Sequence, residues 1–131
     1  MPLTACMLVV DNSESSRNGD FQPSRFEAQV DSINIIADHV LNDNPESSVG
    51  LMSMGGKGPE VLTTLATERG KIHEGLYRTK KKIAGSCHLA TAIQIASVCS
   101  LSASVLAPAF HPRPPLRLLF LSLHIVCVCG R

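Results

Sequence analysis

The sequence has almost no excess of charge of either sign and no long uninterrupted apolar run. Its 131 residues include 12 Lys and Arg against 11 Asp and Glu, a formal net charge of +1. A balanced charge gives no general attraction to nucleic acid or to anionic lipid, so any partner must be recognised by local shape. The apolar run over residues 116–128 contains Arg117 and His124, and it is shorter than the roughly twenty residues that a membrane-spanning helix needs. We therefore expect neither a nucleic acid nor a membrane partner.

The cysteines are too irregular for a disulfide framework. There are five, an odd number, scattered between Cys6 and Cys129, whereas small secreted domains carry an even set. No basic region precedes the first apolar run, and the chain reaches Asp11 too early for a signal peptide. A length of 131 residues suits one domain with a single core. We therefore expect one intracellular domain in a reducing compartment.

The N-terminal half has the pattern of an α/β fold. Cys6–Val10 is an apolar run without alternation, typical of a strand covered on both faces in a mostly parallel sheet. Ser24 and Glu27 have the spacing of a capping box, and the apolar stripe that follows predicts a helix that ends near Asn42. Residues 49–54 predict a second strand, which a right-handed crossover would lay parallel to the first.

The middle of the chain predicts a hairpin and two more helices. Residues 55–59 form a glycine-rich turn, and the β-branched residues 60–65 after it predict an antiparallel edge strand. Thr67 can cap a helix that ends near Leu76, and a basic loop over residues 78–82 follows. A third apolar stripe predicts a helix over residues 89–99.

The loop after the first strand carries the clearest functional pattern. Asp11, Ser13 and Ser15 form D-x-S-x-S, three oxygen donors at the carboxyl end of a strand, where ligands gather in open α/β sheets. One interpretation is a metal site. The other is local: Asp11 and Ser13 hydrogen-bond the loop backbone and hold residues 17–20 in shape as a docking surface.

Three other motifs have simpler interpretations. In residues 50–58, "GLMSMGGKG", Lys57 is followed by glycine and then by a strand, so the pattern of a phosphate-binding loop is not met and a hairpin turn is expected. The basic residues 78–82 contain no interleaved aromatic residue, which favours a solvated loop over a phosphate contact. A fragment of a metal site is one interpretation of Cys127, Cys129 and His124. The alternative is that the two thiols bind no metal. The five histidines show no arrangement that suggests a catalytic triad.

The composition changes from about Val98. Residues 98–131 contain no acidic residue, and four prolines lie between positions 108 and 115. An ordinary globular chain mixes both charges over such a length. We therefore divide the chain into a domain over residues 1–97 and a divergent tail over residues 98–131.

Several segments of residues 1–97 carry a specific resemblance to a known family. They resemble the von Willebrand factor type A domain of the ubiquitin-receptor subunits of the proteasome regulatory particle, in the order "VDNSESSRNGDFQPSRFEAQVDSIN", "NDNPESSVGLMSM", "VLTTL" and "HLATAIQIAS". The resemblance implies a doubly wound, Rossmann-like domain with a mostly parallel sheet, here incomplete. The family continues with a fourth strand, further strands and ubiquitin-interacting motifs, none of which is recognisable after Ser97.

The resemblance implies a docking role without catalysis or cofactor. In the family this domain helps to hold the lid of the regulatory particle to its base, in the cytoplasm and nucleus, while the downstream motifs capture polyubiquitin. For this chain it implies contacts with lid and base subunits and no capture of polyubiquitin. On the local interpretation of the D-x-S-x-S loop, the docking residues are Asp11, Arg17, Asn18 and Asp20.

The resemblance also bears on the metal interpretation. Type A domains that bind ligands through a metal add a threonine from a later loop and an aspartate after the fourth strand to D-x-S-x-S. Here Cys87 stands about where that threonine would be, a thiol is a poor ligand for a hard cation, and the distal aspartate has no counterpart. These departures weigh against a metal site. The alternative function is a metal-dependent ligand-binding domain that acts outside the proteasome.

The missing strands have a structural consequence. Without them the first strand has an unpaired edge, which predicts a marginally stable fold. The apolar residues Leu118–Leu121 are the candidate to fill the position of the fourth strand.

Overall fold

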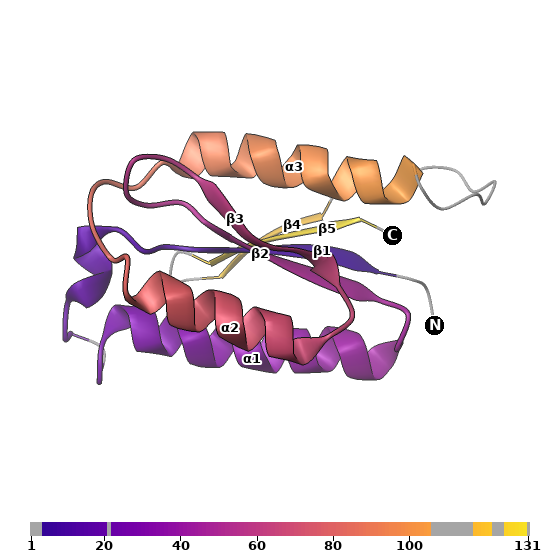
Figure 1. Cartoon of the computed structure of the whole chain (residues 1–131), viewed down its shortest axis with the longest axis horizontal. Helices are drawn as coiled ribbons and strands as arrows, with labels where there is room; N and C mark the ends of the chain where they lie inside the picture. Colours follow the sequence, from indigo (N-terminus) through magenta and orange to yellow (C-terminus); the bar gives the residue numbers. More distant parts are fainter. Residues whose placement is uncertain (1–3, 21, 106–116, 122–124, 131) are drawn as a thin grey trace.

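A computed structural model describes residues 4–20, 22–105, 117–121 and 125–130 of the chain. A five-stranded sheet forms the middle layer, with α1 and α2 on one face and α3 on the other (Figure 1). The elements in chain order are β1 (Ala5–Val10), η1 (Glu14–Arg17), α1 (Arg25–Asp43), β2 (Ser48–Ser53), β3 (Glu60–Ala66), α2 (Arg69–Lys80), α3 (Leu89–Val105), β4 (Arg117–Leu121) and β5 (Ile125–Gly130).

The first three strands have the predicted arrangement. The strand order is β3-β2-β1-β5-β4. β1 and β2 are parallel, with Ala5 opposite Ser48 and Val10 opposite Ser53, as a helical crossover requires. β3 returns antiparallel to β2 and lies at one end of the described sheet. The prediction of a parallel pair followed by an antiparallel edge strand is confirmed.

The partner of β1 on its other side differs from the prediction. β5 pairs with β1 in the antiparallel direction, with Ala5 opposite Gly130 and Val9 opposite Val126. Among the described strands, β4 pairs with β5 alone and lies at the far end of the sheet. The expectation of an unpaired β1 edge was wrong, and so was the placement of Leu118–Leu121 beside β1. Hydrophobicity selects strand-forming segments, but it fixes neither their order nor their direction.

The suspected C-terminal metal fragment lies only partly within the described residues. Cys127 and Cys129 belong to β5 and lie opposite Leu8 and Cys6 of β1. His124 lies outside the described residues.

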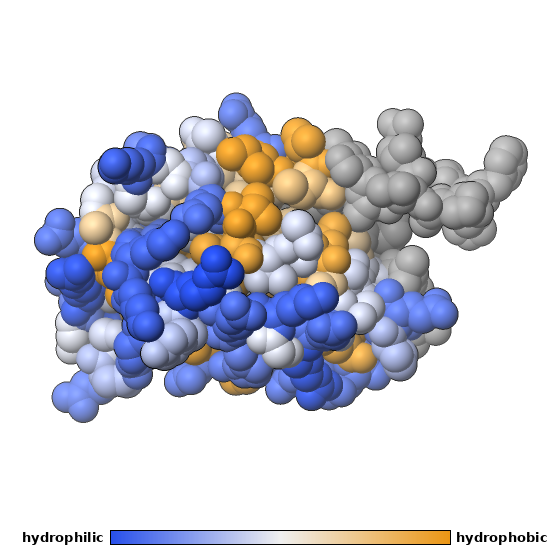
Figure 2. Space-filling model, in the orientation of Figure 1, coloured by the Kyte–Doolittle hydropathy of each residue, from blue (hydrophilic) through white to orange (hydrophobic). Residues whose placement is uncertain are grey.

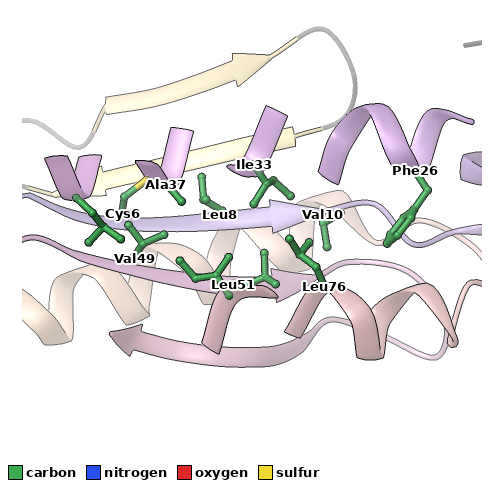
Figure 3. Close-up of a cluster of buried hydrophobic side chains, with 11 residues drawn as sticks. Cys6, Leu8, Val10, Phe26, Ile33, Ala37, Val49, Leu51 and Leu76 are labelled. Carbon is green, nitrogen blue, oxygen red and sulfur yellow. The ribbon is translucent and has the colours of Figure 1, made fainter. Parts of the chain in front are cut away.

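The larger core cluster lies between the sheet and the two helices α1 and α2. Leu8 and Val10 of β1 are fully buried against Ile33 of α1 and Leu76 of α2 (Figure 3). The stripe of α1 predicted from residue spacing is confirmed, because its buried positions follow steps of three and four. The helix begins as predicted, since the Ser24 hydroxyl accepts a hydrogen bond from the backbone N–H of Glu27 at 3.3 Å.

A second cluster fills the opposite face of the sheet. Met7 and Val9 of β1 alternate with the residues of the first cluster, and they pack with Met52 against Ala92 and Ala96 of α3. β1 is therefore covered on both faces, as its unbroken apolar run predicted. α3 continues to Val105, six residues beyond the predicted end, because the sequence has no proline or glycine between Cys99 and Val105.

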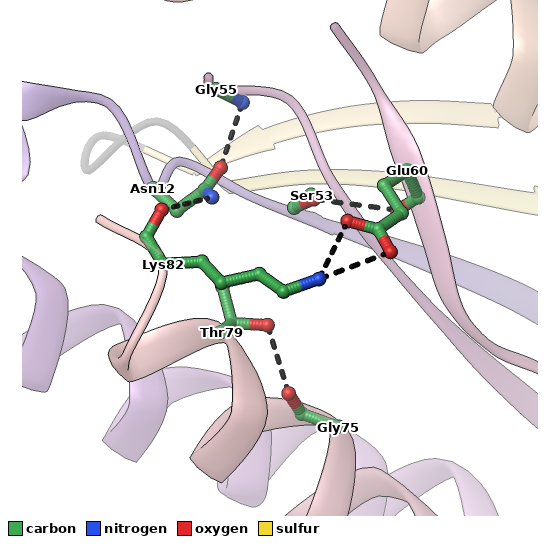
Figure 4. Close-up of polar contacts among 7 residues, drawn as sticks. All are labelled: Asn12, Ser53, Gly55, Glu60, Gly75, Thr79 and Lys82. Atoms are coloured by element: carbon green, nitrogen blue, oxygen red, sulfur yellow. Dashed lines mark hydrogen bonds and ion pairs between the residues drawn. The ribbon is translucent and has the colours of Figure 1, made fainter. Parts of the chain in front are cut away.

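α2 differs from the prediction at both ends. It begins at Arg69, with Glu68 rather than Thr67 in the capping position, and it runs to Lys80 through residues expected to form a loop. Thr79 in this last turn is fully buried, so the segment packs against the protein instead of forming a solvated loop. The Thr79 hydroxyl donates to the carbonyl of Gly75 at 2.8 Å, which satisfies it in the buried position (Figure 4). Basic residues in the last turn also interact favourably with the helix dipole.

The surface is largely hydrophilic over α1 and α2, and apolar side chains gather closer to α3 (Figure 2). Within the described part of the chain, no helix has both the length and the apolar character needed to cross a bilayer.

Candidate functional site

The D-x-S-x-S loop begins at a buried aspartate. Asp11 is only 2% exposed, and its Oδ1 accepts a hydrogen bond from the backbone N–H of Ser13 at 2.8 Å. The backbone N–H of Asp11 donates to Oε1 of Gln29 at 2.9 Å, and Nε2 of Gln29 donates back to the Asp11 carbonyl at 3.4 Å. Gln29, itself 1% exposed, therefore fixes the backbone of Asp11 from helix α1.

Asn12 joins the loop to two other segments of the chain. Its side-chain oxygen accepts from the backbone N–H of Gly55 at 2.7 Å, and its side-chain nitrogen donates to the carbonyl of Lys82 at 3.3 Å (Figure 4). The carbonyl of Asn12 accepts from the backbone N–H of Ala84 at 3.1 Å. One side chain thus connects the ends of β1, β2 and α2, which lie at the carboxyl edge of the parallel strands.

Two glycines allow these segments to approach closely. A Cβ atom on Gly55 would lie 2.5 Å from the backbone nitrogen of Ser13. Gly85 has φ +78°, and a Cβ atom there would lie 2.8 Å from Cα of Gly56. Glycine is required at both positions because the neighbouring atoms belong to the backbone. The turn predicted at residues 55–59 therefore also supports the Asp11 loop.

The serines of the motif are engaged with each other and with the backbone. The hydroxyls of Ser13 and Ser15 lie 2.8 Å apart, within hydrogen-bonding distance. Ser16 is buried, and its hydroxyl donates to the carbonyl of Ser13 at 2.6 Å, which closes the short helix η1.

The other predicted docking residues lie on the exposed part of the loop. Arg17 donates from Nη2 to the carbonyl of Ile83 at 2.6 Å. The carbonyl of Asn18 accepts from the backbone N–H of Arg25 at 3.1 Å. Asp20 forms an ion pair with Arg25 at 2.6 Å, and the pKa of Arg25 is raised by the hydrogen bond and charge of Asp20, with a smaller contribution from Asp11. Asp11 is thus a buried anchor, and Arg17, Asn18 and Asp20 are surface residues of a loop tied down at several points.

Cys87 lies close enough to the loop to respond to its charge. The pKa of the Cys87 thiol is raised, first by burial and second by the negative charge of Asp11. Its Sγ lies 3.6 Å from Sδ of Met54 at the end of β2. The backbone N–H of Glu14 donates to the carbonyl of Gly85 at 3.0 Å, which brings the two loops together.

The donor set at this place does not fit a magnesium ion. It offers one carboxylate, two serine hydroxyls within hydrogen-bonding distance of each other, and a thiol in place of a further oxygen. Magnesium prefers a nearly octahedral shell of oxygen ligands, and sulfur is a poor ligand for such a hard cation. In the part of the chain that the structure describes, no three His, Cys, Asp or Glu residues form a group that could hold a metal.

The arrangement suits recognition of a protein surface. The side chains of Glu14, Ser15, Arg17, Asn18 and Asp20 are exposed, while the residues beneath them are buried and hydrogen-bonded. A surface loop held in one conformation loses little entropy on binding. Sequence reasoning missed Gln29 and Asn12, although Gln29 could have been noticed as a polar residue within the apolar stripe between Phe26 and Ile33.

Fold and site together define a class of protein. Two parallel strands with a crossover helix, covered on both faces and ending in a D-x-S-x-S loop, are typical of an α/β docking or ligand-binding domain. The sequence of residues 6–104 matches the family model of the von Willebrand factor type A domain, and the chain belongs to this family.

Proteasome subunits are among the relatives of the chain. It is 53% identical over 98 residues to the 26S proteasome regulatory subunit RPN10 of Saccharomyces cerevisiae, covering 75% of this chain and 36% of that protein. It is 49% identical to the 26S proteasome non-ATPase regulatory subunit 4 of Dictyostelium discoideum, covering 75% of this chain and 28% of that protein. The crystal structure of the SpRpn10 VWA domain has a TM-score of 0.70 and 40% identity, covering 75% of this chain and 51% of that one.

These similarities confirm the resemblance found in the sequence, over the type A domain. The chain spans only about a third of the length of the two curated relatives, 36% and 28%.

Proposed function

We propose that this chain is a non-catalytic docking component of the proteasome regulatory particle and acts in ubiquitin-dependent protein degradation. The observation that carries the proposal is the 53% identity, over three quarters of this chain, to a protein named as a regulatory subunit of the 26S proteasome. The location that follows is the cytoplasm and nucleus. The partners are subunits of the lid and base, and capture of polyubiquitin is not part of the role of this chain.

The docking surface in this proposal is the loop from Asp11 to Asp20. Its exposed residues Arg17, Asn18 and Asp20 contact the neighbouring subunits, and Asp11 holds the loop in shape from below. The support is the number of hydrogen bonds that fix the loop backbone, together with the poor fit of its donors to a cation. The alternative, a metal-dependent ligand-binding domain outside the proteasome, needs the Asp11 carboxylate as a metal ligand.

Substitution of Asp11 separates the two functions. As an anchor, the carboxylate accepts a backbone hydrogen bond that an amide oxygen can partly replace, so Asp11→Ala should weaken co-sedimentation with proteasomes more than Asp11→Asn. Each charge-assisted hydrogen bond contributes about 1.5–3 kcal/mol. Glu46→Ala, an exposed acidic position at the opposite end of the sheet, is the matched control and should have no effect.

Magnesium provides the opposing test. If the loop is an anchor, neither magnesium nor a chelator should change the melting temperature or the association with proteasomes. A magnesium-dependent rise in melting temperature that disappears in Asp11→Asn would favour the metal-dependent alternative, because a ligand that binds only the folded state stabilises it by mass action. Proteasome association that is equal in Asp11→Ala and in the parent chain would refute the docking role of the loop.

A further inference from the structure

The pairing of β1 with β5 brings two cysteines from opposite ends of the chain to one register position. Cys6 of β1 lies directly opposite Cys129 of β5 in the antiparallel ladder. Directly opposite Cα atoms of antiparallel strands are about 4.5 or 5.5 Å apart, depending on the type of pair. A disulfide needs a Cα separation of about 4.4–6.8 Å. Both types of pair therefore place these two residues within the range of a disulfide.

Cys127, the other cysteine of β5, is a poorer partner for either residue. It lies opposite Leu8, which makes it a diagonal neighbour of Cys6. Diagonal neighbours are about 7–8 Å apart, which is too far for a disulfide unless the backbone moves. Cys127 and Cys129 are two residues apart along one strand, where the Cα separation of about 6.6–6.8 Å is at the upper limit of the range. The geometry therefore favours the pair of Cys6 and Cys129.

The register also assigns these cysteines to one face of the sheet. Residues that lie directly opposite each other in neighbouring strands share a face. Val128 lies opposite Met7, which belongs to the cluster that packs on α3, so Val128 is on the α3 face. Cys129 lies opposite Cys6, which belongs to the cluster on the face of α1 and α2 (Figure 3). Among the described helices α3 is the main neighbour of β5, so Cys129 is placed on the face of β5 that α3 does not cover.

A basic residue occupies the next position in the same row. Arg117 of β4 lies opposite Cys129 in the pairing of β4 with β5. Cys6, Cys129 and Arg117 are therefore consecutive positions across three strands, on one face of the sheet. A neighbouring cation favours the thiolate form of a cysteine, and the thiolate is the form that reacts with oxidants. Of the two cysteines, Cys129 has the position of the reactive one, since Cys6 is 0% exposed.

We propose that Cys6 and Cys129 form a reversible disulfide when the chain meets hydrogen peroxide. The Cys129 thiolate attacks one oxygen of the peroxide, the O–O bond breaks, and a sulfenic acid and hydroxide form. The Cys6 thiol then attacks the sulfur of the sulfenic acid, the S–O bond breaks, and water leaves. The hydroxide takes up the proton that Cys129 released on ionising. The two sulfurs together lose two electrons, and the peroxide is reduced to two water molecules.

Such a bond would fasten β5 to β1 and close a loop that contains nearly the whole chain. A disulfide that closes a long loop restricts the unfolded chain strongly, so oxidation should stabilise the fold. A dithiol reductant returns both thiols, which gives a redox-dependent attachment of the C-terminal strand. Disulfides of intracellular proteins are usually transient or redox-sensing in this way. The inference does not depend on the Asp11 loop or on the proposed docking role.

The test is mild oxidation of the folded full chain with hydrogen peroxide, followed by alkylation of the remaining thiols and digestion without reduction. Trypsin then places the cysteines on three separate peptides, which are residues 1–17 with Cys6, residues 83–117 with Cys87 and Cys99, and residues 118–131 with Cys127 and Cys129. Mass spectrometry should show one dominant cross-link, between residues 1–17 and residues 118–131. Dithiothreitol should remove it.

Two serine variants identify the cysteine of β5 that takes part. Cys129→Ser should abolish the cross-link, whereas Cys127→Ser, the matched control two residues away, should keep it. Oxidation should raise the melting temperature of the parent chain and of Cys127→Ser by at least about 5 °C. It should not raise the melting temperature of Cys129→Ser. Circular dichroism of each reduced variant checks that it is folded, and Cys129→Ala replaces a serine variant that is not.

The role of Arg117 has its own measurement. Arg117→Gln should slow formation of the cross-link several-fold at neutral pH, because the thiolate fraction of Cys129 falls when a neighbouring cation is removed. The difference should disappear at alkaline pH, where the thiol ionises without help. Lys57→Gln removes an exposed charge in the turn after β2 and should leave the rate unchanged.

Three results would overturn the proposal. The first is a cross-link of the folded parent chain that is retained in Cys129→Ser. The second is a dominant disulfide within residues 118–131 or to residues 83–117, and the third is no disulfide under conditions that oxidise the urea-unfolded chain. The chain is tested without proteasomes, so failure of the proposed docking role would not change the outcome.

Discussion

Asp11 acts on its surroundings through both its hydrogen bonds and its charge, and an asparagine would separate these effects. Its Oδ1 accepts a hydrogen bond from Ser13. Its negative charge contributes to the raised pKa of Cys87, after the larger effect of burial. A raised pKa means that less of the reactive thiolate is present at a given pH, so Cys87 should be alkylated slowly near neutral pH.

We therefore predict that Asp11→Asn lowers the pKa of Cys87 part of the way toward its ordinary value. Alkylation of Cys87 by iodoacetamide should then begin at lower pH in the variant than in the parent chain, which mass spectrometry of the Cys87 peptide can follow. Glu14→Gln removes a neighbouring exposed charge that does not contribute to the shift, and it should leave the pH profile unchanged. Identical profiles for Asp11→Asn and the parent would contradict the closeness of the two loops.

The residues of the site were only partly predictable from the sequence. Asp11, Ser13 and Ser15 could be found because their spacing after an apolar run is distinctive. The roles of Gln29, which reaches the backbone of Asp11, and of Asn12 could not, because these contacts depend on how α1 and the loop at Lys82–Ala84 pack against the end of β1. Local pattern reveals which residues are polar within an apolar stripe, but it does not reveal what they contact.

At the scale of elements, the glycines of the turn after β2 and of helix α2 differ in the space available for a side chain. Gly55 faces the backbone of Ser13 and Asn12, with no room for a Cβ atom, whereas Gly70 in the first turn of α2 has no atom within 4 Å of the place where its Cβ would be. We predict that Gly55→Ala destabilises the chain by about 1–3 kcal/mol through overpacking. Gly70→Ala should stabilise it by about 0.4–1 kcal/mol, because alanine restricts the unfolded chain and favours a helix.

Urea unfolding of both variants beside the parent chain measures these changes. The pair is internally controlled, since the same methyl group is added at a packed turn and at an open helix surface. A stable Gly55→Ala variant would mean that the turn can move away from the Asp11 loop, and the loop would then be less firmly supported than its hydrogen bonds indicate.

The elements themselves followed the sequence where apolar periodicity and capping agreed, as in β1, α1 and the β2–β3 hairpin. α2 did not, because the basic residues Arg78 and Lys80 obscured the burial of Thr79 between them. One fully buried residue can keep in a packed helix a stretch whose other residues look like a solvated loop.

At the scale of the whole molecule, the pairing of β5 with β1 places β1 in the middle of the sheet. Val128 lies opposite Met7 in this pairing. We predict that Val128→Pro, which removes a backbone donor and constrains the strand, raises the rate of hydrogen exchange in β1 at least tenfold. Val128→Thr keeps the backbone donor and is the matched control, and it should change the exchange rates much less.

Unchanged hydrogen exchange of β1 in Val128→Pro would show that β1 is protected without β5. The unpaired edge of β1 that the sequence predicted would then be present after all. The sequence could not predict this pairing, because residues 117–130 contain two apolar segments of similar character. Nothing in their composition distinguishes a central strand from an edge strand, or a parallel from an antiparallel one.

The register of β1 has a consequence for the chain as it leaves the ribosome. Ala5 has Ser48 as its neighbour on one side and Gly130, much later in the sequence, as its neighbour on the other. Translation adds residues one by one, so β1 keeps one open edge until the β5 residues have been synthesised. During that interval the nascent chain can be bound by a chaperone along β1, and slower translation would lengthen the exposure.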